Sequence, residues 1–201
     1  MKRRLVVFLA LLTLTAPALA QTPEYVGIPT WRFNFVAAAQ QEDEWCWAAS
    51  VQMILNYYGI PGTQPQIVAR VFGRPIDQGA SDQTISEALN GWAILPNGMR
   101  RTITSIYSPG APPPQLLVAE LAHGNPILLT FATGPYSGHA VVITGAGFIP
   151  TPRGPAVVSV IIRDPWPSPQ NIAADGRNVS SGPQLSQFMR AARSYFLVSV
   201  Q

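Results

Sequence analysis

CWAASVQMILNYY, residues 46–58, is the stretch that most clearly sets an element of the fold. Alanine, methionine and leucine favour helices, and they recur along this stretch. Gly59 directly after it and Pro61 just beyond are typical of a helix end. We therefore expect a helix over 46–58 that begins at Cys46.

Outward from this helix, the pattern is helical in the first half of the chain and extended in the second. Further helices are expected over 64–72, over 82–92 with Ser81 or Asp82 as the cap, from Pro114 through Ala122, and over 184–192. Strands are expected over 100–107, 127–132, 140–148, 156–163 and 195–200. An extended lead-in is expected over 21–36 and a polar loop over 171–180. Helices followed by strands, without alternation, predict an α+β fold.

The first twenty residues have the pattern of a secretory signal peptide. Lys2-Arg3-Arg4 precedes the apolar run 5–15, and Ala18-Leu19-Ala20 fits the small-x-small cleavage rule. A membrane anchor is the alternative, but this run is short for a bilayer and Pro17 follows it. We therefore expect a signal peptide over 1–20, a single mature domain over 21–201, and a secreted or periplasmic protein.

The charge of the mature chain excludes a nucleic-acid footprint. Three of the 13 basic residues belong to the leader, which leaves ten basic residues against the 10 acidic ones. The mature chain has no lysine and no stripe of arginines, which a nucleic-acid surface would need. No later stretch is long and apolar enough for a transmembrane helix, so no membrane partner is expected after cleavage. The pattern specifies no oligomeric state.

Cys46 is the single cysteine, which excludes a disulfide within the chain. The free N–H groups and the positive dipole end of a helix start stabilise a thiolate, which is the nucleophilic form. The acidic residues 42–44 just upstream oppose this effect. A buried apolar cysteine is the ordinary alternative for a lone thiol. The residues that accompany Cys46 favour the nucleophile.

A histidine and an aspartate could act with this thiol. His139 follows a glycine and opens a predicted strand, where its ring would face a cleft as a general base rather than serve as an edge histidine. Asp164 ends the next predicted strand, and if the two strands are neighbours its carboxylate can orient the imidazole. A simple Asp-Pro turn is the alternative for Asp164. The second histidine, His123, lies near a predicted helix end. The helix dipole alone favours a cation there, so no catalytic role is expected for His123.

An oxyanion site is the remaining requirement of such a centre. Gln40 lies six residues before Cys46, and Gln41 is next to it. A side-chain amide in this register can join the backbone N–H of the cysteine and stabilise a developing oxyanion.

These motifs together resemble those of the compact bacterial papain-like cysteine proteases. The likeness extends over about 36–200 and rests on Gln40, EWCWAA at 44–49, GHAVVITG at 138–145 and Asp164-Pro165. It is nearest to the avirulence-protease group of plant pathogens and more distant to the double-glycine leader peptidases. The resemblance implies Cys46 as nucleophile, His139 as base, Asp164 as orienting carboxylate and Gln40 at the oxyanion. It also implies a helical N-terminal half packed against an antiparallel C-terminal sheet.

The expected function is that of an exported thiol peptidase. It would act on a peptide or protein substrate through a cysteinyl acyl-enzyme, and it would need no cofactor. One cysteine and two histidines predict no metal site. Two alternatives stay open: a cell-wall amidase or transglutaminase-like acyl transferase with the same triad, and a non-catalytic papain-like binding module.

Overall fold

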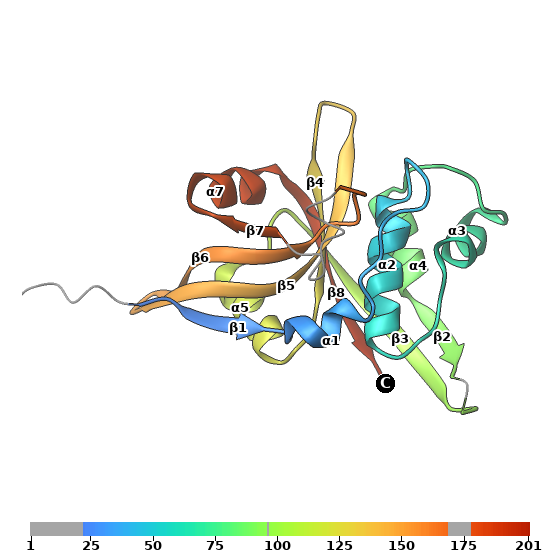
Figure 1. The fold of residues 1–201 in the computed structure, drawn as a ribbon, viewed down its shortest axis with the longest axis horizontal. Coiled ribbons are helices and arrows are strands. Elements are labelled where there is room, and N and C mark those ends of the chain that lie inside the picture. The colour runs from blue at the N-terminus through green and yellow to red at the C-terminus, as the bar shows by residue number, and fades with distance from the viewer. Residues whose placement is uncertain (1–21, 96, 169–177) are drawn as a thin grey trace, which may run out of the picture.

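The computed structural model describes residues 22–95, 97–168 and 178–201, so the expected leader at 1–20 lies outside the described residues. An antiparallel β-sheet runs between two groups of helices (Figure 1). Most helices precede most strands along the chain. The predicted α+β class, with a helical first half packed against an antiparallel sheet, is confirmed.

The helices and strands have the following bounds. The helices are α1 Thr30–Asn34, α2 Cys46–Tyr57, α3 Gln64–Phe72, α4 Asp82–Leu89, α5 Pro114–Ala122 and α7 Gly182–Ala191. The strands are β1 Glu24–Gly27, β2 Gly91–Ile94, β3 Arg100–Pro109, β4 Ile127–Ala132, β5 Gly138–Thr151, β6 Gly154–Arg163, β7 Asn178–Ser181 and β8 Ala192–Val200.

The described strands form one eight-stranded sheet in the order β2-β3-β8-β4-β5-β6-β7, with β1 also paired to β5. Strand β5 is long enough to pair with three other strands. Its first half pairs with β4, from Ala132 opposite Gly138 to Ile127 opposite Ile143. Its second half pairs with β6 and β1. The N-terminal strand is thereby joined to the centre of the sheet.

Both faces of this sheet are covered, and each face has its own apolar core. Alternate residues of a strand point to opposite faces. Leu128 of β4 accordingly packs with α2, α3 and α4, whereas its neighbours Ile127 and Leu129 pack with α5 and α7. The same alternation separates Val142 from Val141 on β5. Two-sided burial is the reason why these strands read as nearly continuous apolar runs in the sequence.

Helix α2 runs through the first of these cores. Its residues from Trp47 to Leu55 are buried, apart from Gln52. It ends at Tyr57, one residue earlier than predicted, and Gly59 then adopts a positive φ of 77° as helix ends require. The helix is packed against β5 and β4. Burial of an apolar helix against a sheet is what fixes its start relative to the strand ends.

Three expectations need correction. The lead-in over 21–36 contains strand β1 but also helix α1, whose Phe33 is buried in the core. Helix α4 ends at Leu89, not at residue 92, because Gly91 begins strand β2. In the expected loop over 171–180, residues 178–180 belong to strand β7, and 171–177 lie outside the described residues.

The early end of α4 has a local cause in Asn90. Its backbone is extended, and its side chain bonds Ser86 of α4 on one side and Ser105 of β3 on the other. The amide of Asn90 therefore replaces the next helical hydrogen bonds and starts the β2–β3 pairing.

No helix among the described residues has the length and apolar character needed to cross a bilayer.

We predict that Asn90→Ala lowers the free energy of unfolding by about 1–3 kcal/mol, because partly buried donors and acceptors lose their partners. Urea denaturation of the two proteins measures this change. Gln83→Ala serves as the control: Gln83 is exposed and bonds only Glu87 within α4. Its loss should cost under about 0.5 kcal/mol. Equal stability of the Asn90 and Gln83 variants would contradict the prediction.

Candidate active site

Cys46 is the first residue of α2 and is half-buried. The tryptophans on either side of it bond the helix start to a neighbouring loop. The indole N–H of Trp45 donates to the carbonyl of Ile76 at 2.8 Å, and that of Trp47 donates to the carbonyl of Gln78 at 3.0 Å. These bonds hold the loop between α3 and α4 against the helix. The thiol thus lies among free backbone N–H groups at the positive end of a rigid helix.

His139 lies near the start of β5, opposite Phe131 of β4. The rings of these two residues meet edge to face with centroids 5.6 Å apart, which restricts rotation of the imidazole. The preceding Gly138 leaves little space, because a Cβ there would lie 3.3 Å from the carbonyl oxygen of Phe131. The glycine before the histidine therefore lies at a tightly packed position, where a Cβ would require a small shift of its neighbours.

Asp164 accepts a hydrogen bond from Nε2 of His139 at 2.7 Å. The side chains are 14% and 24% exposed, so the pair is largely shielded from water. The pairing of β5 with β6 accounts for this contact. Val142 lies opposite Arg163, and continuing the register places Asp164 diagonally across from His139. The expectation that the two predicted strands are neighbours is confirmed.

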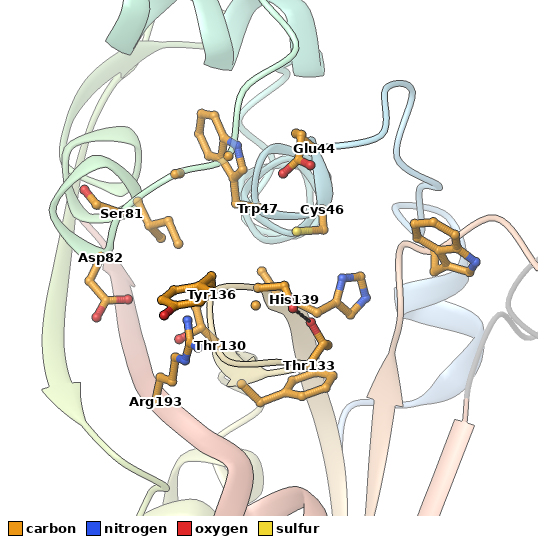
Figure 2. Close-up of a pocket in the computed structure, with 18 of the residues that line it drawn as sticks. Glu44, Cys46, Trp47, Ser81, Asp82, Thr130, Thr133, Tyr136, His139 and Arg193 are labelled. Carbon is orange, nitrogen blue, oxygen red and sulfur yellow. Dashed lines mark hydrogen bonds between the residues drawn. The ribbon is translucent and has the colours of Figure 1, made fainter.

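The electrostatics of His139 follow from its two partners. Burial lowers its pKa, but hydrogen bonds to Asp164 and Cys46, together with the charges of these groups, raise the pKa to about 9. Since Nε2 is bonded to Asp164, Nδ1 is the ring nitrogen left for the sulfur. Figure 2 shows Cys46 and His139 on the facing walls of one cleft. The arrangement stabilises an imidazolium beside a sulfur nucleophile.

A buried hydroxyl joins the two walls. Ser50 of α2 is fully buried, and its Oγ donates to the carbonyl of Ala140 at 3.1 Å. Ser50 lies one helical turn after Cys46, and Ala140 directly follows His139. This bond therefore sets the distance between the helix that carries the sulfur and the strand that carries the imidazole.

Gln40 lies beside this group, but its amide does not line the cleft. The side chain is buried, and Nε2 donates to the backbone carbonyls of Glu42 at 3.0 Å and Asp43 at 2.7 Å. The structure thus brings Cys46, His139 and Asp164 together and places Gln40 next to them with its N–H groups engaged. Gln41 is exposed, and its backbone N–H bonds Gln64.

The cleft around these residues has a volume of about 840 Å³. Its helical wall carries Glu44, Trp47 and Asp82, and its sheet wall carries His139 and Arg193 (Figure 2). Its size lies within the range of clefts that bind ligands in proteins.

Two exposed aromatic side chains stand along the cleft. Tyr136 projects from the hairpin between β4 and β5 and is fully exposed, and Trp166 is 50% exposed. Exposed aromatics in a cleft are typical contacts for ligand side chains.

A hydrogen-bonded network that joins two residues lining the cleft through a buried hydroxyl was not foreseen from the sequence. Thr130 of β4 bonds Ser194 of β8 at 2.5 Å, and Ser194 donates to the Asp82 carboxylate at 2.7 Å. Ser194 is fully buried. Buried polar residues within apolar runs are the only sequence signal for this network and for Ser50.

Among the described residues, no three metal-ligating side chains of His, Cys, Asp or Glu gather in one place.

The raised pKa of His139 predicts how stability depends on pH. The folded protein keeps this proton up to about pH 9, whereas an unfolded histidine loses it near about 6.5. The folded state binds more protons between these values, so this contribution to stability is complete below about pH 6.5 and is lost as pH rises through about 9. Urea unfolding of the wild type between pH 6 and pH 10 measures the loss.

His139→Gln should remove most of this pH dependence, and His123→Gln should leave it unchanged, because His123 is exposed. The same pH dependence in the wild type and the His139 variant would show that another group is responsible.

Comparisons with known proteins agree with this geometry. A family model described as Peptidase_C39 like family matches residues 33–181. The peptidase domain of Streptococcus ComA, a bifunctional ABC transporter involved in a quorum-sensing pathway, has a similar structure with 14% identity and a TM-score of 0.54, over 81% of this chain and 96% of that domain. A double-glycine-motif protease from an AMS/PCAT transporter, solved with its leader peptide, has 16% identity and a TM-score of 0.49, over 81% and 91%. No curated protein matches the sequence.

The family match extends over most of the chain, and the likeness to the ComA domain shows a common fold. The predicted resemblance to papain-like cysteine proteases is therefore confirmed. The family model found is that of the Peptidase_C39-like family, and neither similar structure is of the avirulence-protease group, to which the sequence showed the nearer likeness. The chain belongs to the Peptidase_C39-like family and is a cysteine peptidase.

Proposed function

We propose that this cysteine peptidase is exported and cleaves peptide bonds with Cys46, His139 and Asp164 as its catalytic triad. One observation carries the proposal: three residues far apart in the sequence converge at one cleft. His139 is hydrogen-bonded to Asp164 at 2.7 Å, and Cys46 faces it across the same cleft. A structural histidine would not require both an acidic partner and a thiol at a helix start.

Under this proposal, acyl transfer proceeds in the following steps. The Cys46 thiolate attacks the substrate carbonyl carbon, and a C–S bond forms. As the C–N bond breaks, the imidazolium of His139 passes its Nδ1 proton to the leaving amine. His139 then takes a proton from water, which attacks the thioester and releases the carboxylic acid product and the thiolate. Asp164 holds the ring throughout by its bond to Nε2.

Oxyanion stabilisation is assigned to the backbone N–H of Cys46 and, by the same proposal, to Gln40. The first N–H groups of a helix have no acceptor within the helix, so that of Cys46 is available to an oxyanion. The amide of Gln40 now donates to two backbone carbonyls. Its participation requires that one of these bonds be exchanged for a bond to the oxyanion. Its Oε1 accepts no hydrogen bond within the described structure, so no bond of this oxygen would have to break.

Export rests on the leader sequence. The basic, apolar and small-residue regions of 1–20 would direct secretion and cleavage after Ala20. The mature enzyme would then act on peptide or protein substrates in the periplasm or outside the cell. A secreted form that begins at Gln21, identified by mass spectrometry, would support this part of the proposal. Retention of the uncleaved chain in the cytoplasm would refute it.

Cys46→Ala should abolish peptide cleavage, with a loss of about 10³-fold or more, because the sulfur that forms the acyl-enzyme is removed. The measurement is mass spectrometry of a diverse peptide library incubated with residues 21–201 of each protein. An added primary amine in a parallel reaction tests acyl transfer. Processing by both proteins would remove Cys46 from the mechanism, and amine incorporation in preference to hydrolysis would identify a transferase.

Ser50→Ala should lower kcat/KM by about 10-fold or more, because the bond that sets the Cys46–His139 distance is lost and small displacements of reacting groups are costly. It should also slow alkylation of Cys46 by iodoacetamide near pH 6, where the thiolate depends on the imidazolium. Ser199→Ala is the control, since Ser199 is exposed and bonds only Thr104. Unchanged alkylation in the Ser50 variant would exclude this positioning effect.

A further inference from the structure

Gln64, the first residue of α3, is almost completely buried at 1% exposure. Its amide makes two hydrogen bonds to a segment more than twenty residues earlier in the chain. Nε2 donates to the carbonyl of Ala39 at 2.8 Å, and Oε1 accepts from the backbone N–H of Gln41 at 2.9 Å. The two bonds grip the backbone on either side of Gln40. The side chain thus forms the backbone hydrogen bonds that a neighbouring strand would otherwise provide to this short segment.

The backbone at the start of α3, which carries Gln64, is rigid. Thr63 and Gln66 form a capping box at the start of α3, and Pro65 occupies the first turn. A proline and a reciprocal cap restrict the backbone on both sides of Gln64. The amide therefore holds the 39–41 segment from a fixed point in the helical half of the molecule.

A second contact holds the same segment from the sheet. The backbone N–H of Gln40 donates to the carbonyl of Pro165 at 2.8 Å, and Pro165 follows Asp164. Beyond Gln40, its own amide bonds the carbonyls of Glu42 and Asp43 in the turn that leads to Cys46. The segment is thus held by α3, by the end of β6 and by the turn into α2. The second and third anchors lead directly to the active site, because Pro165 follows Asp164 and the turn precedes Cys46.

We propose that Gln64 is a positioning residue for the oxyanion site of this peptidase, an inference that rests on the proposed function. It touches neither the triad nor the cleft. Its two bonds fix the backbone from which the Gln40 amide projects, and they fix it relative to the first N–H of α2. Packing alone would not require an amide at a site with 1% exposure, because an apolar side chain of equal length fills the space without buried polar atoms.

This proposal separates two reactions of Cys46. Cleavage of a peptide passes through a tetrahedral oxyanion and needs the donors that surround it. Alkylation by iodoacetamide forms no oxyanion and needs only the thiolate, which His139 stabilises. Loss of the Gln64 contacts should therefore slow the first reaction and spare the second. Damage to the whole site would slow both.

The test compares wild type, Gln64→Met and the control Gln83→Met, which changes the same residue type at an exposed position of α4 without touching the 39–41 segment. Each is assayed with a peptide found to be cleaved by the wild type, and each is alkylated with iodoacetamide over a range of pH. Gln64→Met should lower kcat by about 10- to 100-fold, with KM and the alkylation rate and its pH profile within about twofold of wild type. Gln83→Met should keep both activities.

An unchanged kcat in Gln64→Met, or an equal fall in kcat and alkylation, would overturn the inference. If Gln64→Met does not fold, Gln64→Glu takes its place, because it keeps the length and the acceptor but loses the donor to Ala39. A wild type that cleaves no peptide, or a Cys46→Ala variant that still does, would refute the proposed function and this inference with it. Cysteine-dependent cleavage that persists at the wild-type rate in the Gln64 variant would refute this inference alone.

Discussion

The antiparallel pairing of β5 with β6 is the constraint on which the active site depends. It brings the start of one strand next to the end of the other, so that Asp164 reaches Nε2 of His139. Strand β5 is covered on both faces, and β6 packs Val160 and Ile162 into one of the two cores. This burial fixes their register, because a shift by one residue would turn apolar side chains to the wrong face. The geometry of the His139–Asp164 pair therefore depends on the packing of the sheet core.

Helix α2 completes the site from the other half of the molecule. Its apolar length is buried against the sheet, and the Ser50 hydroxyl bonds the strand at Ala140. Trp45 and Trp47 extend this support to the loop beyond α3. The sulfur is held by a helix that cannot slide without loss of core contacts. Stability and chemistry share the same contacts here, and this explains how a chain with one cysteine, and so no internal disulfide, keeps a defined site.

Much of the fold followed from local signals, and the exceptions have a common cause. The helix that begins at Cys46 and strand β4 were predicted closely, because formers, stops and β-branched runs mark them. Helix α1, strand β2 and strand β7 were not predicted. Each is short, and each depends on partners far along the chain: Phe33 on the core, residues 91–94 on β3, and residues 178–181 on β6. Local preference is weak in such segments, and tertiary contacts decide their conformation.

The sequence by itself determined the types of residue and their order: one cysteine at a helix start, a histidine that opens a strand, and an aspartate that ends another. A helix start and a strand end can be recognised locally, because a few neighbouring residues encode them. Only the tertiary structure decided that these groups meet, since their distance depends on strand register and on how α2 packs. It also decided that buried Ser50 and Gln64 each bond a distant backbone. A polar residue in a helix has many possible partners, and only the complete fold selects one.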